Sequence, residues 1–132
     1  MYPFVATSIE GFVQQIAVSY VRHGYFFYVT GWIPEGKDPV LVDRKLVERY
    51  GVHMSKWARA RRKRAGQANM AYIRFGNLFV MLATHGAHDF FKEEANVRDV
   101  RRAPMKIEGY SIGYSRKSAG LQAFVPPPQP AT

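Results

Sequence analysis

Apolar residues recur at spacings of three and four along the first part of the chain, as on one face of an amphipathic helix. This stripe consists of Ile9, Phe12, Val13, Ile16, Tyr20 and Val21. Thr7 stands three residues before Glu10, which is the form of a capping box, and Gly24 is a typical C-terminal stop. The pattern predicts a helix over residues 8–22.

A second helix is predicted after a turn at residues 34–37. Asp38 is a typical N-cap, Pro39 suits the first helical position, and Gly51 follows the last apolar residue. The expected buried stripe is Val42, Leu46 and Tyr50, with Val47 beside it. A further helix is predicted over residues 89–98, with its phenylalanines facing inward.

Runs of aromatic and β-branched residues predict the strands. The runs cover residues 25–33, 70–75, 78–84, 105–115 and 121–125. The first and third runs are apolar on both faces, so we expect them in the middle of a sheet. Gly76-Asn77 predicts a hairpin turn, and Gly109 and Gly113 interrupt the run 105–115.

The predicted order of elements, α-β-α-α-β-β-α-β-β, indicates an α+β fold in which helices pack on one mixed, largely antiparallel sheet. We expect a single domain over residues 1–125, because 132 residues are too few for two adequate cores. Four prolines predict an irregular C-terminal tail at residues 126–132. The absence of a Gly-rich strand-to-helix fingerprint excludes a full Rossmann unit.

Composition narrows the classes of protein further. The chain is 47% apolar, which excludes a disordered chain, and it has no cysteine, which excludes disulfide scaffolds and thiolate metal sites. It has no apolar run of about 20 residues and no secretion-signal pattern at its start. We therefore expect a soluble, cytoplasmic protein with no membrane partner.

Charge adds the first indication of function. The chain has 19 Lys and Arg against 10 Asp and Glu, a net charge of +9, and most of the excess falls in residues 44–64. Its densest part, residues 56–64, has six cations in nine positions and is predicted to belong to a helix from Ser55 to about Ala68. Such crowding is costly unless a polyanion neutralises it, and phosphate backbones do so with release of counterions.

We therefore expect a small nucleic-acid-binding protein that recognises phosphate backbones. RNA or single-stranded DNA is favoured over duplex, because aromatic residues are abundant on the predicted strands. Trp57 can stack on a base, but we expect it mainly to anchor the basic helix. Gln67 and Asn69 come too late to suggest a major-groove reader. The expected contacts are Lys56, Trp57, Arg59, Arg61, Arg62, Lys63, Arg64, Arg98, Arg101, Arg102, Arg116 and Lys117.

Two histidines and a tyrosine suggest a different chemistry. His85 and His88 follow a predicted strand and could bind a divalent metal, or could be ordinary loop residues that cap a helix or face solvent. Tyr114 lies three residues before Lys117, and nearby cations would make its hydroxyl a better nucleophile. We expect no cofactor, except Mg²⁺ or Mn²⁺ if this second chemistry holds.

The order of an apolar strand at Tyr28–Gly31, the histidine pair and Tyr114 resembles the HUH endonucleases. The resemblance implies a metal-dependent nickase in which the metal polarises the scissile phosphate and the tyrosine forms a phosphotyrosyl intermediate. One residue separates the histidines in that family, whereas two separate His85 and His88. On a straight strand this spacing points them to opposite faces, unless a turn at Gly86 brings them together.

Three hypotheses thus remain: a non-catalytic nucleic-acid-binding protein, which the charge favours, a metal-dependent phosphodiesterase, and a subunit of a larger ribonucleoprotein or protein assembly. In the third, the basic helix and the proline-rich tail would be docking segments.

Overall fold

The computed structural model describes residues 5–52, 56–115 and 120–124. The predicted tail at 126–132 lies outside the described residues. The helical elements are α1 (Ile9–Gln15), the π-helical segment η1 (Ile16–Tyr20), the 3₁₀ turn η2 (Val21–His23), α2 (Pro39–Tyr50), α3 (Lys56–Arg64) and α4 (Asp89–Glu93). The strands are β1 (Phe27–Trp32), β2 (Met70–Phe75), β3 (Leu78–Ala83), β4 (Arg98–Asp99), β5 (Met105–Ile107), β6 (Tyr110–Ser115) and β7 (Gly120–Phe124). The predicted α+β class is confirmed, and within the described residues no helix has both the length and the apolar character needed to cross a bilayer.

The strands form two sheets, whereas the sequence pattern predicted one. A four-stranded sheet has the order β2-β3-β1-β4, a three-stranded sheet has the order β5-β6-β7, and every strand pairing is antiparallel. The predicted strand over 105–115 is in fact a hairpin, because the chain reverses at Glu108 (φ 47°) and Gly109 (φ 85°). The central positions expected for β1 and β3 are confirmed.

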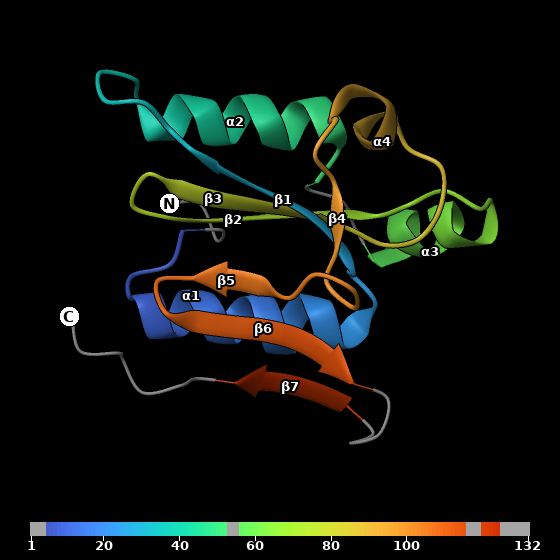
Figure 1. Cartoon of the computed structure of the whole chain (residues 1–132). Helices are drawn as coiled ribbons and strands as arrows, with labels where there is room; N and C mark the ends of the chain where they lie inside the picture. The colour runs from blue at the N-terminus through green and yellow to red at the C-terminus, as the bar shows by residue number, and fades with distance from the viewer. Residues whose placement is uncertain (1–4, 53–55, 116–119, 125–132) are drawn as a thin grey trace.

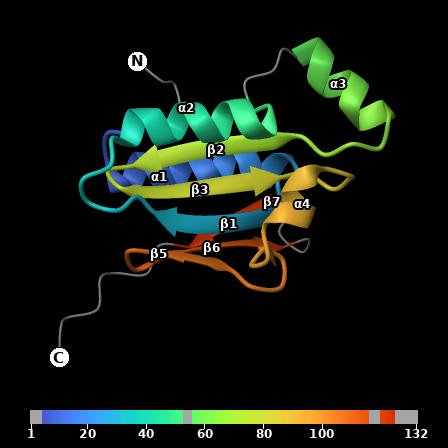
Figure 2. The same ribbon diagram turned by 90° about the horizontal axis from the view of Figure 1, so that it is seen from above.

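The four-stranded sheet is covered on both faces, so the domain has two cores (Figures 1 and 2). Helix α2 and α4 pack on one face, where β2 contributes Met70 and Tyr72. Helix α1, η1 and strands β5 and β6 pack on the other face, where β2 contributes Ala71 and Ile73. This double coverage explains why β2 and β3 are apolar at nearly every position.

Local capping signals define ends of three helical segments. The Asp38 carboxylate accepts a hydrogen bond from the Val40 N–H at 3.0 Å and caps α2, which ends at Gly51 with φ 66°. Gly24, with φ 98°, ends η2 as predicted. The first cap differs from the prediction, because Ser8 and not Thr7 accepts a hydrogen bond from the Gly11 N–H, at 3.0 Å.

Two predicted helices are shorter than expected. Helix α4 stops at Glu93 instead of residue 98, because Arg98 and Asp99 leave the helix to pair with β1. Helix α3 stops at Arg64 instead of residue 68 and has no buried residue. The anchoring role predicted for Trp57 is wrong, since this residue is 77% exposed.

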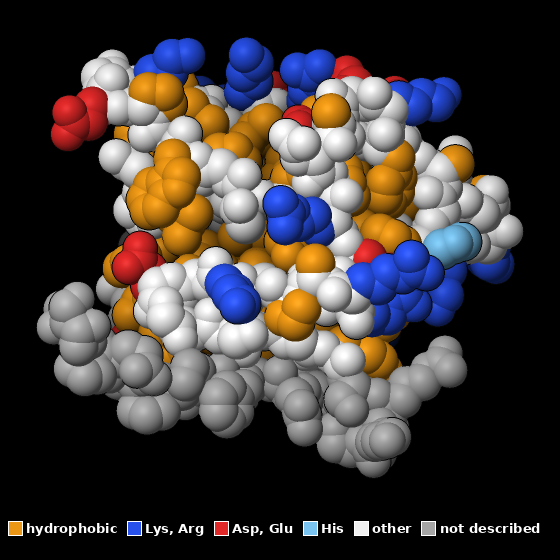
Figure 3. All heavy atoms as spheres, viewed as in Figure 1, with side chains coloured by type: hydrophobic (Ala, Val, Ile, Leu, Met, Phe, Trp, Pro, Cys, Tyr) orange, Lys and Arg blue, Asp and Glu red, His pale blue; other side chains and the backbone are white. Residues whose placement is uncertain are grey.

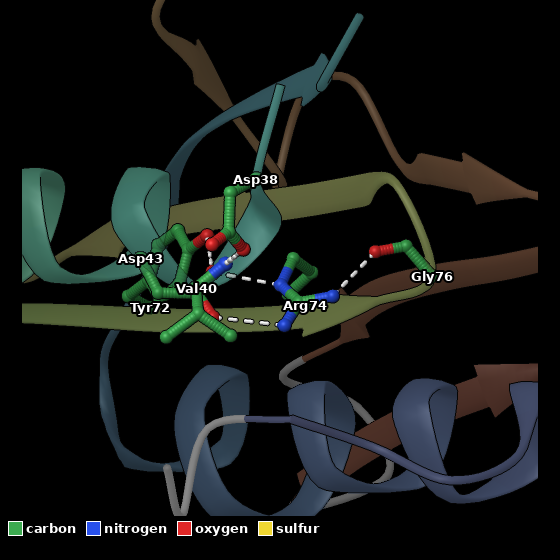
Figure 4. A network of polar contacts seen from close by, with 6 residues as sticks. All are labelled: Asp38, Val40, Asp43, Tyr72, Arg74 and Gly76. Atoms are coloured by element: carbon green, nitrogen blue, oxygen red, sulfur yellow. Dashed lines mark hydrogen bonds and ion pairs between the residues drawn. The ribbon is translucent and has the colours of Figure 1, made fainter. Parts of the chain in front are cut away.

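A buried ion pair ties α2 to β2 (Figure 4). Asp43 is completely buried and Arg74 is 8% exposed, and the Asp43 carboxylate also accepts a hydrogen bond from the Tyr72 hydroxyl. Burial raises the pKa of Tyr72, so this hydroxyl stays protonated and donates. Arg74 Nη1 donates to the Gly76 carbonyl oxygen at 2.6 Å. The apolar stripe of α2 did not predict this network.

Candidate nucleic-acid interface

Helix α3 presents its charge on two sides. With 3.6 residues per turn, Lys56, Arg59 and Lys63 share one side, which we call the inner stripe. Trp57, Arg61 and Arg64 share another side, which we call the outer stripe. All six of these side chains are exposed. Figure 2 shows α3 beyond the end of the four-stranded sheet, outside the layers of the domain.

Within the part of the chain that the structure describes, no ion pair with a carboxylate neutralises the charge of α3. Ion pairs between described residues join Arg49 to Glu93, Arg74 to Asp43 and Arg101 to Asp99, and none of these pairs includes a residue of α3. Among the cations of residues 44–64, where most of the excess charge falls, Arg49 is matched by a carboxylate. Figure 3 shows further cations over the outer surface of α2 and a group at the end of the molecule where α3 lies.

Hydrogen bonds to its backbone hold the C-terminal end of α3 against the domain. Asn69 Nδ2 donates to the Arg59 carbonyl oxygen at 3.2 Å, and the Gln67 N–H donates to the Arg62 carbonyl oxygen at 2.8 Å. The segment that follows α3 then pairs with the loop after β3 through the Gln67–Ala87 bridge. A side chain at Gly86 would come within 2.7 Å of the Ala68 nitrogen, so the two backbones meet too closely for any other residue.

The inner stripe lines a cleft of about 950 Å³ between α3 and the body of the domain. Tyr20, at the end of η1, lines the cleft together with Tyr25 and Phe26, which directly precede β1. Asn69, Thr84 and His85 line it from the ends of β2 and β3. The described residues that line the cleft include several cations and aromatic rings but no carboxylate. The cleft therefore suits an anionic ligand that also carries flat apolar groups.

Arg101 also lines the cleft, and its guanidinium is held in place. Its guanidinium carbon lies 4.5 Å from the centre of the Phe26 ring, and its Nε and Nη2 donate to the Asp99 carboxylate at 3.0 and 2.8 Å. The hydrogen bonds from Arg101 lower the pKa of Asp99. Arg101 thus combines a fixed cation with a stacked aromatic ring, but Asp99 offsets part of its charge.

The other cations of the predicted second cluster lie apart from this cleft. Arg98 is exposed on β4 and lines a separate hollow of about 750 Å³ together with Lys106. Arg102 is exposed in the loop after β4. Arg116 and Lys117 lie outside the described residues. The structure thus brings the inner stripe together with Arg101, but not with Arg98.

The two histidines have separate roles in the structure. His88 caps α4, since its Nδ1 accepts a hydrogen bond from the Phe90 N–H at 3.0 Å. Its Nε2 must then carry the proton, which it donates to the Tyr50 carbonyl oxygen at 3.0 Å. Both nitrogens of His88 are therefore engaged, while His85 is exposed in the cleft. Within the described ranges, no three His, Asp or Glu side chains gather in a group that could hold a metal ion.

Tyr114 lies on β6, in the other sheet from the strand that precedes the histidines. Its ring packs against Phe26, with 4.8 Å between the ring centres. Tyr114 belongs to the partly buried residues around the core that contains α1. This position matches a sheet residue that packs with its neighbours.

Comparison of the chain with protein-family models, curated proteins and solved structures found no match.

The aromatic side of the cleft and Asn69 did not emerge from the sequence as site residues. Tyr20 ends the apolar stripe of the first helix and Tyr25 and Phe26 begin a strand, so all three read as core residues. The structure places all three at an edge, partly buried and facing α3. A usable signal was the break in structure at Gly24 between two aromatic segments, because such breaks lie at the ends of sheets and helices.

Proposed function

We propose that this protein binds single-stranded nucleic acid, either RNA or single-stranded DNA, by contacts to the phosphate backbone. The main support is α3, which has six cations in nine residues, no buried side chain, and no ion pair with a described carboxylate. A helix with this composition adds nothing to either core and repels itself electrostatically. Phosphate groups would relieve that repulsion and release their counterions.

The surroundings of α3 favour a single strand over a duplex. The inner stripe faces a cleft with aromatic rings, and the outer stripe adds an exposed tryptophan to two arginines. Bases can stack on such rings only where they are not already stacked and paired in a duplex. Phosphate contacts from both stripes would fix the path of the strand without reading its sequence.

A salt titration tests this proposal. Fluorescence anisotropy would measure the affinity for a random single strand and a random duplex at several salt concentrations. We expect tighter binding of the single strand, and a plot of log affinity against log salt with a slope of roughly −2 for every three phosphates contacted. Binding that does not change between low and physiological salt would contradict the proposal.

A further inference from the structure

Asn69 has the single buried side-chain polar atom that lacks a hydrogen-bond partner within the described part of the chain. The residue is 8% exposed and lines the cleft, and the atom is Oδ1. Its Nδ2 donates to the Arg59 carbonyl oxygen, and because a carbonyl can only accept, the free atom must be the amide oxygen. A buried acceptor without a donor is costly, so the site favours a ligand that brings a donor.

Asn69 lines a cleft whose other described side chains include several cations and so favour a negatively charged ligand. Lys56, Arg59 and Lys63 favour an anion, whereas the Asn69 amide oxygen would repel a fully ionised phosphate. A ligand that satisfies both must carry a phosphate and, at some distance from it, an N–H donor. The volume of about 950 Å³ lies within the range of about 300–1,000 Å³ that is typical of small-molecule sites.

We propose that the cleft binds one unpaired nucleotide of the bound strand. Its phosphate contacts the inner stripe, its base lies against Tyr25 and Phe26, and an N–H group of the base donates to Asn69 Oδ1. Each nucleobase has an N–H on its Watson–Crick edge, and this group is used in pairing when the base is in a duplex. The cleft therefore selects an unpaired base of any identity, an inference that rests on the proposed function.

A comparison of probes tests the role of the base without altering the protein. Labelled single strands of about ten nucleotides, within the site sizes of ~4–16 known for such proteins, would be made as RNA, as DNA, and as abasic chains of both kinds. We expect the intact strands to bind between about five-fold and a hundred-fold more tightly than their abasic counterparts, as for stacking of one base. Equal affinities would overturn the inference and leave the proposed function intact.

Comparison of the RNA probes with the DNA probes distinguishes a contact to the base from a contact to the sugar. If abasic RNA binds as tightly as intact RNA, while abasic DNA binds weakly, the 2′-hydroxyl is the donor to Asn69 and the proposed base contact is overturned. If no probe binds at any salt concentration, the proposed function itself fails.

Matched variants locate the effect in the cleft. The double variants R59Q/K63Q and R61Q/R64Q remove the same charge from the inner and the outer stripe. We expect R61Q/R64Q to weaken intact and abasic strands by the same factor and to preserve their ratio. We expect R59Q/K63Q and Asn69→Leu to bring the ratio of intact-strand to abasic-strand affinity close to one. If R61Q/R64Q removes the difference in affinity between intact and abasic strands and R59Q/K63Q does not, the base binds outside the cleft. If N69L does not fold, the comparison of probes and the two double variants still test the inference.

Discussion

The Arg74 guanidinium meets the Asp43 carboxylate edge to edge, with Nε 2.7 Å from Oδ1 and Nη2 2.9 Å from Oδ2. The pair joins the first half of α2 to β2 in a place where the Asp43 side chain is fully buried and the Arg74 side chain is 9% exposed. Two parallel hydrogen bonds of this kind fix the relative position of the two elements as well as neutralising the charges. The pair thus sets where α2 lies on the sheet.

We expect Asp43→Ala to be strongly destabilising, because it leaves the Arg74 cation buried without a partner. The expected loss in the free energy of unfolding is about 3–5 kcal/mol, measured by urea denaturation. Replacing both residues, as in D43L/R74M, should cost less than D43A alone, since no buried charge then remains. Glu48→Gln, on the exposed side of the same helix, serves as the control and should change stability by less than ~0.5 kcal/mol.

Gly86→Ala should shift the C-terminal end of α3 away from the domain. The new methyl group would lie 2.7 Å from backbone atoms of both Gln67 and Ala68, in addition to the strain of φ +142°. Gly36→Ala provides a matched control, because Gly36 also has a positive φ, +90°, but no atom within 4 Å of its added carbon. Strain alone costs on the order of 1–3 kcal/mol.

Thermal unfolding of the two glycine variants, together with their affinity for single strands measured by fluorescence anisotropy, would distinguish backbone strain from displacement of α3. We expect G86A to lose more stability than G36A and also to bind single strands more weakly. Equal behaviour of the two variants in both measurements would show that contact between the backbones near residues 67 and 86 does not position α3.

Trp57 should report on binding without contributing to stability. It is 77% exposed, so Trp57→Leu should change the free energy of unfolding by less than ~0.5 kcal/mol. Trp32, at 65% exposure, is the other tryptophan, and W32F leaves Trp57 as the sole source of tryptophan emission. A single strand added to W32F should quench the emission. Binding by anisotropy with unchanged emission would place the strand away from the outer stripe.

The ion pair between Asp99 and Arg101 should survive to low pH. Hydrogen bonds from Arg101 hold the pKa of Asp99 below the ordinary value of 3.8. A carboxyl whose pKa is lower in the folded state adds stability above its unfolded pKa, and that contribution is lost as the pH falls through its folded pKa. NMR titration should therefore give Asp99 a midpoint below 3.8, with the Phe26 ring signals shifting at the same pH.

Arg101→Gln provides the control for this titration. It removes the charged donor, so the midpoint of Asp99 should move up toward its ordinary value. A wild-type midpoint at or above 3.8 would mean that the pair does not form in solution.

Elements with local end signals could be predicted from the sequence almost residue by residue. Helix α2 runs between its Asp38 cap and Gly51, and the β2–β3 hairpin turns at Gly76-Asn77, because each signal acts within a few residues. The early end of α4 depends instead on pairing with β1, which is distant in sequence. The turn at Glu108 uses a positive φ in a residue other than glycine, which no composition rule indicates.

In the candidate site, too, local features could be predicted from the sequence, whereas features that depend on distant contacts could not. The charge density of α3 is a property of consecutive residues, so the pattern predicted it. The direction of that charge depends on where α3 lies relative to Tyr20, Tyr25 and Phe26, and that position follows from contacts such as the one between Asn69 and Arg59. His88 is similar, since its second hydrogen bond goes to Tyr50, on another helix.

No side chain of α3 is buried, and the hydrogen bond from Asn69 that holds this helix in place goes to the backbone of Arg59 and not to its side chain. Substitutions along α3 are thus free to alter affinity or ligand preference while both cores keep their packing. In evolution or in the laboratory, this helix is the part of the chain where new specificity can be selected at the least risk to folding.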